Sequence, residues 1–175
     1  MPITTERLYI VPATGPLLRL IVAENWPGLS AALGGVDIAE HWLHFPEAIR
    51  WMRDYLQEHP DEAGWWTRLI IHRKDVRLIG TCGFKGPPTP EGIVEIGYEI
   101  ADGYQGQGLA TETARALVEH AFAQGGVRVA VAHTLAEENA SVAVLRKLGF
   151  RFVEEVFDLE DGKIWKWERS TQQGM

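Results

Sequence analysis

A pair of glycines directly before a run of helix-forming residues is the feature of this sequence with the clearest chemical meaning. Gly106 and Gly108 flank Gln107 in the segment YQGQGLATETA, and the apolar stretch IVEIGYEIA precedes it. This order predicts a strand, a tight turn and a helix. Successive backbone N–H groups in such a turn, together with the positive end of the helix dipole, form an anion site. Because glycines expose that backbone, the segment predicts a phosphate or pyrophosphate site.

Three known phosphate-binding patterns can be compared with this turn. A Walker loop requires a lysine after its glycines, and none follows here. A dinucleotide fingerprint needs a third small residue where this chain has Thr111, and it needs an acidic residue that the stretch VRVAVAHT lacks. The third pattern, Q/R-x-x-G-x-G/A, is matched in full from Gln105 to Ala110. The third pattern is therefore favoured, and a dinucleotide site is the weaker alternative.

Hydrophobic periodicity predicts strands and helices on both sides of this turn. Predicted strands cover residues 6–13, 65–73, 77–84, 93–101, 127–135, 150–159 and 163–169. Predicted helices cover residues 15–26, 46–59, 109–123 and 139–149, whereas residues 27–40 are rich in glycine and ambiguous. Runs of strands interrupted by helices predict an α/β fold of the α+β type, with a mixed sheet covered by helices on both faces.

Length and composition limit the classes of function. The chain has 175 residues, 46% of them hydrophobic, and we expect residues 1–175 to form a single domain. A formal net charge of −7 argues against a nucleic-acid partner but is compatible with a cationic acceptor, such as an amine or a basic peptide. The single cysteine, Cys82, allows no internal disulfide, and no signal peptide or membrane span is visible. We therefore expect a cytoplasmic protein without a membrane partner.

Two motifs in the second half of the chain carry a resemblance to a known family. The first is QGQGLATE, which begins at Gln105, and the second is NASVAVLRKLGF, which begins at Asn139. Together they resemble the core of the GNAT superfamily of acetyl-CoA-dependent N-acetyltransferases, and more narrowly its RimJ/RimL-type branch, which acetylates protein N-termini and small amines. The resemblance implies a mostly antiparallel central sheet of about seven strands, splayed at its centre. It also implies acetyl-CoA as the acyl donor and no metal.

The resemblance further implies a role in cofactor binding for each matching residue. The backbone N–H groups of the glycine turn would hold the pyrophosphate of coenzyme A, and the end of the central strand would pair through its backbone with the pantetheine arm. The start of the last helix would lie near the pantetheine and the sulfur. The predicted cofactor-binding residues are Tyr98, Ile100, Gln105, Gly106, Gln107, Gly108, Leu109, Ala110, Thr111, Asn139 and Ser141.

Acetyl transfer to an amine requires a proton acceptor and groups that stabilise the leaving thiolate. We predict that Glu95, on the central strand, is the base and acts through water, with Glu99 on the same face as the second candidate. The alternative is that both are solvated strand carboxylates. Ser141 could hydrogen-bond the thioester sulfur, or it could serve only to cap the last helix. Leu145 stands where many GNAT members have a tyrosine, which argues against a tyrosine acid at that position.

Histidines and aromatic residues outside these motifs have plainer interpretations. His41 and His44 are too few to bind a metal, so we predict no metal site, and we interpret His133 as a satisfied polar residue. A predicted C-terminal hairpin, which bears Trp165 and Trp167, could pack against a second subunit of a homodimer. An aromatic acceptor pocket could be formed by Trp42, Phe45, Trp51, Trp65 and Trp66.

The sequence therefore predicts an acetyl-CoA-dependent N-acetyltransferase. A primary amine, either a protein N-terminus or a small amine, would attack directly in a ternary complex, because no well-supported nucleophile is visible. Three alternatives remain. A non-catalytic coenzyme A-binding domain would bind without turnover, and a dinucleotide-binding oxidoreductase would bind NAD. An acyltransferase could also use a different acyl donor, such as succinyl-CoA, which the motifs do not distinguish from acetyl-CoA.

Overall fold

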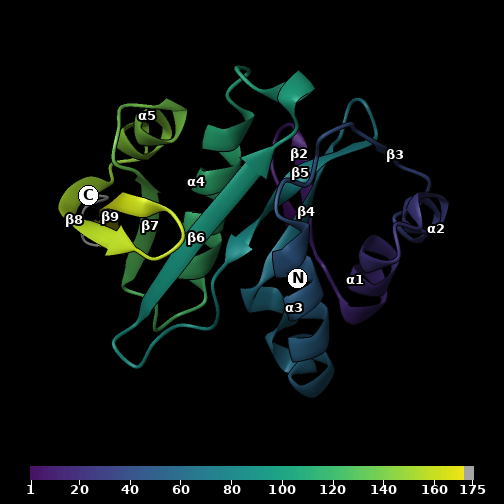
Figure 1. The fold of residues 1–175 in the computed structure, drawn as a ribbon, viewed down its shortest axis with the longest axis horizontal. Helices are drawn as coiled ribbons and strands as arrows, with labels where there is room; N and C mark the ends of the chain where they lie inside the picture. Colours follow the sequence, from purple (N-terminus) through teal and green to yellow (C-terminus); the bar gives the residue numbers. More distant parts are fainter. Residues whose placement is uncertain (172–175) are drawn as a thin grey trace.

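The computed structural model describes residues 1–171 and shows a sheet that crosses the molecule between two groups of helices (Figure 1). Its strands are β1 (Ile3–Thr4), β2 (Leu8–Pro12), β3 (Asp37–Ile38), β4 (Thr67–His72), β5 (Arg77–Phe84), β6 (Ile93–Ile100), β7 (Val129–Leu135), β8 (Arg151–Asp158) and β9 (Gly162–Ser170). Its helices are α1 (Gly15–Val22), α2 (Trp26–Ala32), α3 (Pro46–Glu58), α4 (Leu109–Ala123) and α5 (Ala140–Lys147), with short 3₁₀ helices η1 (Pro60–Trp65) and η2 (Asp102–Tyr104). None of the helices in this described part is long and apolar enough to cross a membrane.

The strands form one mixed sheet that opens at its centre. Their order is β1-β2-β4-β5-β6-β7-β9-β8, and β3 pairs with β5 beside this path. Only the β6–β7 and β3–β5 pairs are parallel among the described strands. β6 and β7 pair only where residues 93–95 face residues 129–131, and beyond these positions each strand continues without the other. This mostly antiparallel, splayed sheet with helices on both faces confirms the predicted fold class.

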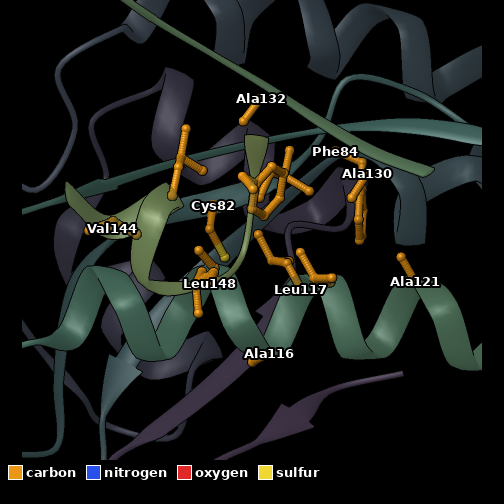
Figure 2. Close-up of a cluster of buried hydrophobic side chains, with 14 of the residues drawn as sticks. Cys82, Phe84, Ala116, Leu117, Ala121, Ala130, Ala132, Val144 and Leu148 are labelled. Atoms are coloured by element: carbon orange, nitrogen blue, oxygen red, sulfur yellow. The ribbon is translucent and has the colours of Figure 1, made fainter. Parts of the chain in front are cut away.

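One face of the sheet is covered by α4 and α5. Figure 2 shows Leu117 of α4 directed into a cluster that includes Cys82 and Phe84 of β5, Ala130 of β7 and Leu148, which follows α5. This packing holds strands from both sides of the splay against one helix. It therefore keeps the two halves of the sheet together where their backbones no longer pair.

The other face is covered by α1, α2 and α3, which enclose a second buried cluster. The alternation of side chains along β6 separates the two faces: Val94 and Ile96 belong to the cluster under α4, whereas Glu95, Gly97 and Glu99 point to the face of α3. The central strand thus directs its carboxylates away from α4 and toward the side where α3 packs.

The N-terminal helical region differs from the sequence prediction, which placed one helix over residues 15–26. α1 ends at Val22, Glu24 adopts a left-handed backbone with φ of 52°, and α2 begins at Trp26. The side chain of Asn25 accepts a hydrogen bond from the N–H of Gly28 at 3.0 Å and so caps the second helix. The prediction was wrong there because this cap begins a new helix at Trp26, after α1 has already ended at Val22. Similarly, Trp65 ends η1 and does not begin β4.

A partly buried carboxylate ties the first turn of α4 to the segment before β2. Glu112 accepts hydrogen bonds from the Thr5 hydroxyl at 2.6 Å, from the Arg7 N–H at 2.9 Å and from Arg7 Nε at 2.6 Å. Arg7 also donates from Nη1 to the carbonyl of Gln107 at 2.8 Å. The network therefore fixes both the start of α4 and the glycine turn that precedes it.

We expect replacement of Glu112 by Gln to destabilise the protein in a pH-dependent way. Burial raises the pKa of Glu112, but hydrogen bonds from Thr5 and Arg7 outweigh it and leave that pKa below its ordinary value of 4.5. A carboxyl whose pKa is lowered by folding contributes stability above pH 4.5, and this contribution is lost as the pH falls through the lowered value. At pH 7 the Glu112→Gln variant should lose about 1–2 kcal/mol of unfolding free energy.

Urea unfolding at pH 7 and below pH 4.5 checks this expectation. The difference between Glu112→Gln and the parent should shrink at the lower pH, because the parent carboxyl is then increasingly protonated. Glu119→Gln, at an exposed position of the same helix, is the matched control. An equal cost at both pH values would contradict the assigned role of the ionised carboxylate.

Candidate active site

The turn between β6 and α4 presents backbone N–H groups that have no acceptor within the described chain. The N–H of Gln105 still donates to the carbonyl of Asp102 at 3.3 Å, and the N–H of Glu112 donates to the carbonyl of Gly108 at 3.1 Å. Between them, none of the N–H groups of residues 106–111 donates to another atom of residues 1–171. Part of this set consists of the free N–H groups that every helix has in its first turn. Together they have the donor pattern of an anion site.

Both glycines of the turn adopt a left-handed backbone. φ is 73° at Gly106 and 77° at Gly108, a region that side chains other than glycine enter at a cost. A Cβ atom at Gly106 would meet nothing within 4 Å, and one at Gly108 would meet only the end of the Arg7 side chain at 3.5 Å. Backbone conformation, and not crowding by neighbours, therefore requires the glycines, and the space above the N–H groups stays open.

Two arginines that belong to neither of the two motifs lie beside this turn. A shallow cleft of about 550 Å³ is lined by Arg7, Gly108, Thr111 and Arg115, among others. Arg115 is exposed, lies one helical turn after Thr111, and forms no ion pair within residues 1–171. The spacing of Thr111 and Arg115 on one helix face was the available signal. The cleft thus adds an available cation to the free N–H groups.

The open side of β6 carries backbone groups that β7 does not reach. The carbonyl of Glu95 accepts a bond from Lys85 and the N–H of Ala101 donates to Ile79, so odd-numbered residues of β6 direct their backbone polar groups toward β5. Tyr98 and Ile100, two of the predicted cofactor-binding residues, therefore direct theirs toward the splay. The Ile100 carbonyl accepts a bond from the Gln105 side chain at 3.0 Å.

The start of α5 lies near this open edge. Asn139 caps the helix, because its side chain accepts a hydrogen bond from the N–H of Val142 at 3.0 Å. Asn139 therefore fills the capping role that was the alternative for Ser141. The Ser141 hydroxyl instead interacts with the hydroxyl of Tyr98. Burial raises the pKa of Tyr98 to about 12, and the interaction with Ser141 offsets only part of this shift. Tyr98 is thus a protonated hydroxyl at neutral pH.

The two candidate bases have different surroundings. Oε1 of Glu95 lies 2.9 Å from His133 Nδ1 and 2.5 Å from Lys85 Nζ, while its Oε2 has no partner in residues 1–171. Both oxygens of Glu99 are engaged, by the Thr81 hydroxyl at 2.7 Å and by the N–H and ring of His44 at 3.2 and 3.0 Å. Glu95 therefore retains an oxygen that can accept a proton, whereas both oxygens of Glu99 are used in hydrogen bonds to Thr81 and His44.

Distance also separates the two carboxylates. Four positions along a strand span about 13 Å, so Glu95 and Glu99 cannot both reach one reacting nitrogen directly. Glu95 occupies the last position at which β6 pairs with β7, which is where the splay begins. Glu99 lies nearer the glycine turn. The geometry therefore favours different roles for the two side chains.

His41 and His44 contact carboxylates. His44 Nε2 lies 3.6 Å from Asp102 Oδ1, and His41 Nδ1 lies 3.0 Å from Asp102 Oδ2. These contacts, with the His44–Glu99 pair, link the segment before α3 to η2, which directly precedes the glycine turn. In the part of the chain that the structure describes, no group of three or more metal-ligating side chains is close enough to hold a metal.

A cleft of about 440 Å³ lies between α3 and the central strands. Of the aromatic residues proposed for an acceptor pocket, Phe45, Trp51 and Trp66 line it. Trp42 is instead buried in the second core cluster, and Trp65 packs on Phe84 with a ring-centroid distance of 5.1 Å. The predicted aromatic pocket is thus present in part, and Glu99 lies at its edge.

The C-terminal hairpin uses its tryptophans within its own chain. Trp167 is only 2% exposed, and its Nε1 donates to the Thr134 hydroxyl at 3.0 Å. Trp165 packs against the same core cluster. The Trp167 side chain is therefore already buried within its own chain, and a homodimer that packs through this hairpin stays a prediction.

Known structures share this fold over nearly their whole length. RimL, the ribosomal L7/L12 alpha-N-protein acetyltransferase, in complex with coenzyme A, aligns with a TM-score of 0.68 and 21% identity, covering 97% of this chain and 98% of RimL. A spermidine N-acetyltransferase SpeG chimera from Vibrio cholerae and hSSAT aligns with a TM-score of 0.70 and 13% identity, covering 95% of this chain and 97% of the chimera. At these identities the similarity shows the fold alone.

Sequence comparison identifies the family. The acetyltransferase (GNAT) domain model matches residues 17–151. YjdG of Bacillus subtilis (strain 168), named as an N-acetyltransferase, is 28% identical over 148 residues, covering 83% of this chain and 87% of YjdG. These matches confirm the resemblance first seen in the two motifs, and they exclude the dinucleotide-binding alternative. The chain belongs to the GNAT acetyltransferase family, and it is an acetyl-CoA-dependent N-acetyltransferase.

Proposed function

We propose that residues 1–175 act as one catalytic domain that binds acetyl-CoA along the open side of β6 and transfers the acetyl group directly to a primary amine. The acceptor would be a small amine or a protein N-terminus. The free N–H groups of residues 106–111, which continue the unpaired edge of β6, carry the proposal. RimL, which shares the fold, has been solved with coenzyme A.

The chain offers complementary groups to each part of the cofactor. The residue 106–111 N–H groups and the α4 dipole would hold the pyrophosphate, and Arg115 would meet a further phosphate. The free backbone groups of Tyr98 and the N–H of Ile100 would pair with the amides of the pantetheine arm, in the way that a strand pairs with a sheet edge. Asn139 would hold the start of α5, and thereby Ser141, beside the arm.

Acetyl-CoA supplies a thioester carbonyl that an amine can attack. Glu95 would take up a proton from the incoming ammonium, directly or through water, at its free Oε2. The Tyr98 hydroxyl would donate a proton to the departing sulfur, with the Ser141 hydroxyl beside it to orient it. The new C–N bond forms as the C–S bond breaks, and the nitrogen then releases its second proton to solvent, while Tyr98 regains from solvent the proton that it gave to the sulfur. This tyrosine would replace the one missing at Leu145.

A covalent acetyl-enzyme is not part of the proposal. The only cysteine, Cys82, is 5% exposed, and burial raises the pKa of its thiol to about 12. Such a thiol is a poor nucleophile at neutral pH. A single buried thiol is also compatible with the cytoplasmic location that we propose.

The pyrophosphate assignment predicts opposite effects of Thr111→Glu on binding and on helix stability. The new carboxylate should weaken acetyl-CoA binding roughly ten-fold by repelling the phosphates, while favouring the positive end of α4. Isothermal titration of both Thr111→Glu and the neutral control Thr111→Gln with acetyl-CoA measures the effect. Equal affinities of the two variants would place the pyrophosphate elsewhere.

The different surroundings of the carboxylates predict different kinetic defects. Glu95→Gln should lower kcat about 10²–10³-fold with little change in acetyl-CoA affinity, because it removes the proton acceptor. Glu99→Gln should mainly raise KM for the acceptor, because it weakens the contacts that hold His44 and the neighbouring cleft residues. Steady-state kinetics with a fixed amine separates the two. A Glu95→Gln variant with unchanged kcat would show that this side chain is merely a solvated strand carboxylate.

A further inference from the structure

The floor of the cleft between α3 and the sheet lacks a side chain at Gly97 of β6. Gly83 of β5 lies directly opposite Gly97 in the antiparallel register and also lines the cleft, although a Cβ atom at Gly83 would collide with the Trp66 carbonyl. A Cβ atom at Gly97 would meet nothing within 4 Å, so no protein neighbour requires this glycine. A flat group can therefore lie against the backbone of the central strands, between Glu95 and Glu99.

The wall above this floor is an ordered set of aromatic rings. Trp51 stacks on Tyr55 with centroids 5.0 Å apart and meets the edge of Trp66 at 5.1 Å. Trp66 Nε1 and the Tyr55 hydroxyl both donate to Glu62. Because Glu62 satisfies the polar atoms of Tyr55 and Trp66, the wall offers mainly apolar ring surface to the cleft.

Two rings at the cleft are unusually exposed for their size. Trp51 is 52% exposed and Phe45 is 68% exposed, although both line the same cleft. Exposed apolar surface that gathers at a cavity is typical of a ligand site. A bound aromatic group would cover both rings and recover the free energy that their exposure costs.

The charges around the cleft suit a single ammonium group. Lys85, at the cleft edge, is paired with Glu95, and Glu99 already uses both oxygens on Thr81 and His44. Only Oε2 of Glu95 is left to accept a proton from the incoming amine. A polyamine would bring further positive charges beside Lys85, which lines the cleft, and a peptide would bring backbone groups into a largely apolar space.

We propose that the acceptor is a small primary monoamine carried on an aromatic or similarly flat apolar body. The aromatic body lies on the Gly83–Gly97 floor against Trp51 and Phe45, and the amine points toward Glu95. This assignment rests on the function proposed above and names the substrate class of the same site. The ammonium loses one proton to Glu95, and its nitrogen then bonds to the acetyl carbon as the C–S bond breaks. The nitrogen releases a second proton, which balances the proton taken up by the departing sulfur, so the products are the N-acetyl amine and the free coenzyme A thiol.

A panel of acceptors tests the substrate class through release of free coenzyme A thiol. The four acceptors are 2-phenylethylamine, propylamine, spermidine and a short peptide with an N-terminal serine. We expect kcat/KM for 2-phenylethylamine to exceed the other values at least ten-fold. Equal or higher values for spermidine, propylamine or the peptide would overturn the substrate class and leave the acetyltransferase function intact. Binding of acetyl-CoA without turnover of the aromatic amine would also overturn it, whereas failure to bind acetyl-CoA would overturn the proposed function itself.

The Gly97→Val substitution would place a side chain on the floor of the cleft without destabilising β6. Valine favours strands, and the backbone at this position is not left-handed, so thermal stability should be equal or higher. We expect KM for 2-phenylethylamine to rise at least ten-fold while the Kd for acetyl-CoA stays the same, with a smaller effect from Gly97→Ala. An unchanged KM in a folded Gly97→Val protein would show that the acceptor does not lie on this floor.

Trp51→Ala tests the wall, and Trp26→Ala is its matched control. Trp26 is also partly exposed, at 37%, but it packs on Trp42 away from this cleft. Trp51→Ala should reduce kcat/KM for 2-phenylethylamine about ten-fold and leave that for propylamine nearly unchanged, so the preference for the ring is lost. Trp51→Phe should retain most of it. Equal losses for both amines, or equal effects of the Trp51 and Trp26 replacements, would contradict the proposed contact.

Discussion

The divergence of β6 and β7 after Glu95 is the constraint on which the rest of the site depends. Two parallel strands that stop pairing leave backbone N–H and C=O groups at the centre of a sheet, where such groups are normally bonded. The two halves of the sheet stay together because α4 packs against strands on both sides of the opening. The unpaired groups of Tyr98 and Ile100 then become an edge that a peptide-like arm can join.

The turn after β6 extends this edge into an anion site, and its position depends on a contact far away in the sequence. Glu112, in the first turn of α4, accepts hydrogen bonds from Thr5 and Arg7 in the N-terminal segment before β2. Arg7 also donates a hydrogen bond to the carbonyl of Gln107 in the turn. The first N–H groups of α4 are therefore fixed relative to β6. A fixed spacing favours the binding of a long, flexible molecule at two places, because the protein loses less conformational entropy when the ligand binds.

The carboxylates of β6 show how one strand face can serve two purposes. Glu95, Gly97 and Glu99 share a face because side chains alternate along a strand. Their neighbours differ: Glu95 keeps a free oxygen at the splay, Gly97 leaves open floor, and Glu99 is bound by His44 and Thr81. His44 also approaches Asp102, so the segment that begins the aromatic cleft is linked to the start of the glycine turn. The acceptor side and the donor side of the site thus share a set of contacts.

The sequence by itself determined the features that depend on local order. The strand–turn–helix around Gly106 and Gly108 and the mixed sheet could be predicted, because periodicity and glycine act over a few neighbouring positions. The splay of the sheet and the family followed instead from the resemblance carried by the two motifs. The boundary between α1 and α2 was missed, since helix-forming residues continue past the end of α1 to the Asn25 cap.

Only the tertiary structure decided which distant residues meet. Glu95 and Glu99 have different partners, and the Tyr98 hydroxyl lies beside Ser141. Trp167 is buried in the core of its own chain. Of the five aromatic residues considered for the acceptor pocket, Phe45, Trp51 and Trp66 line the cleft, whereas Trp42 and Trp65 do not. These outcomes depend on how strands and helices pack across long stretches of chain. Residue type and spacing describe which face of an element a side chain occupies, but the packing of that face against another element determines what the side chain touches.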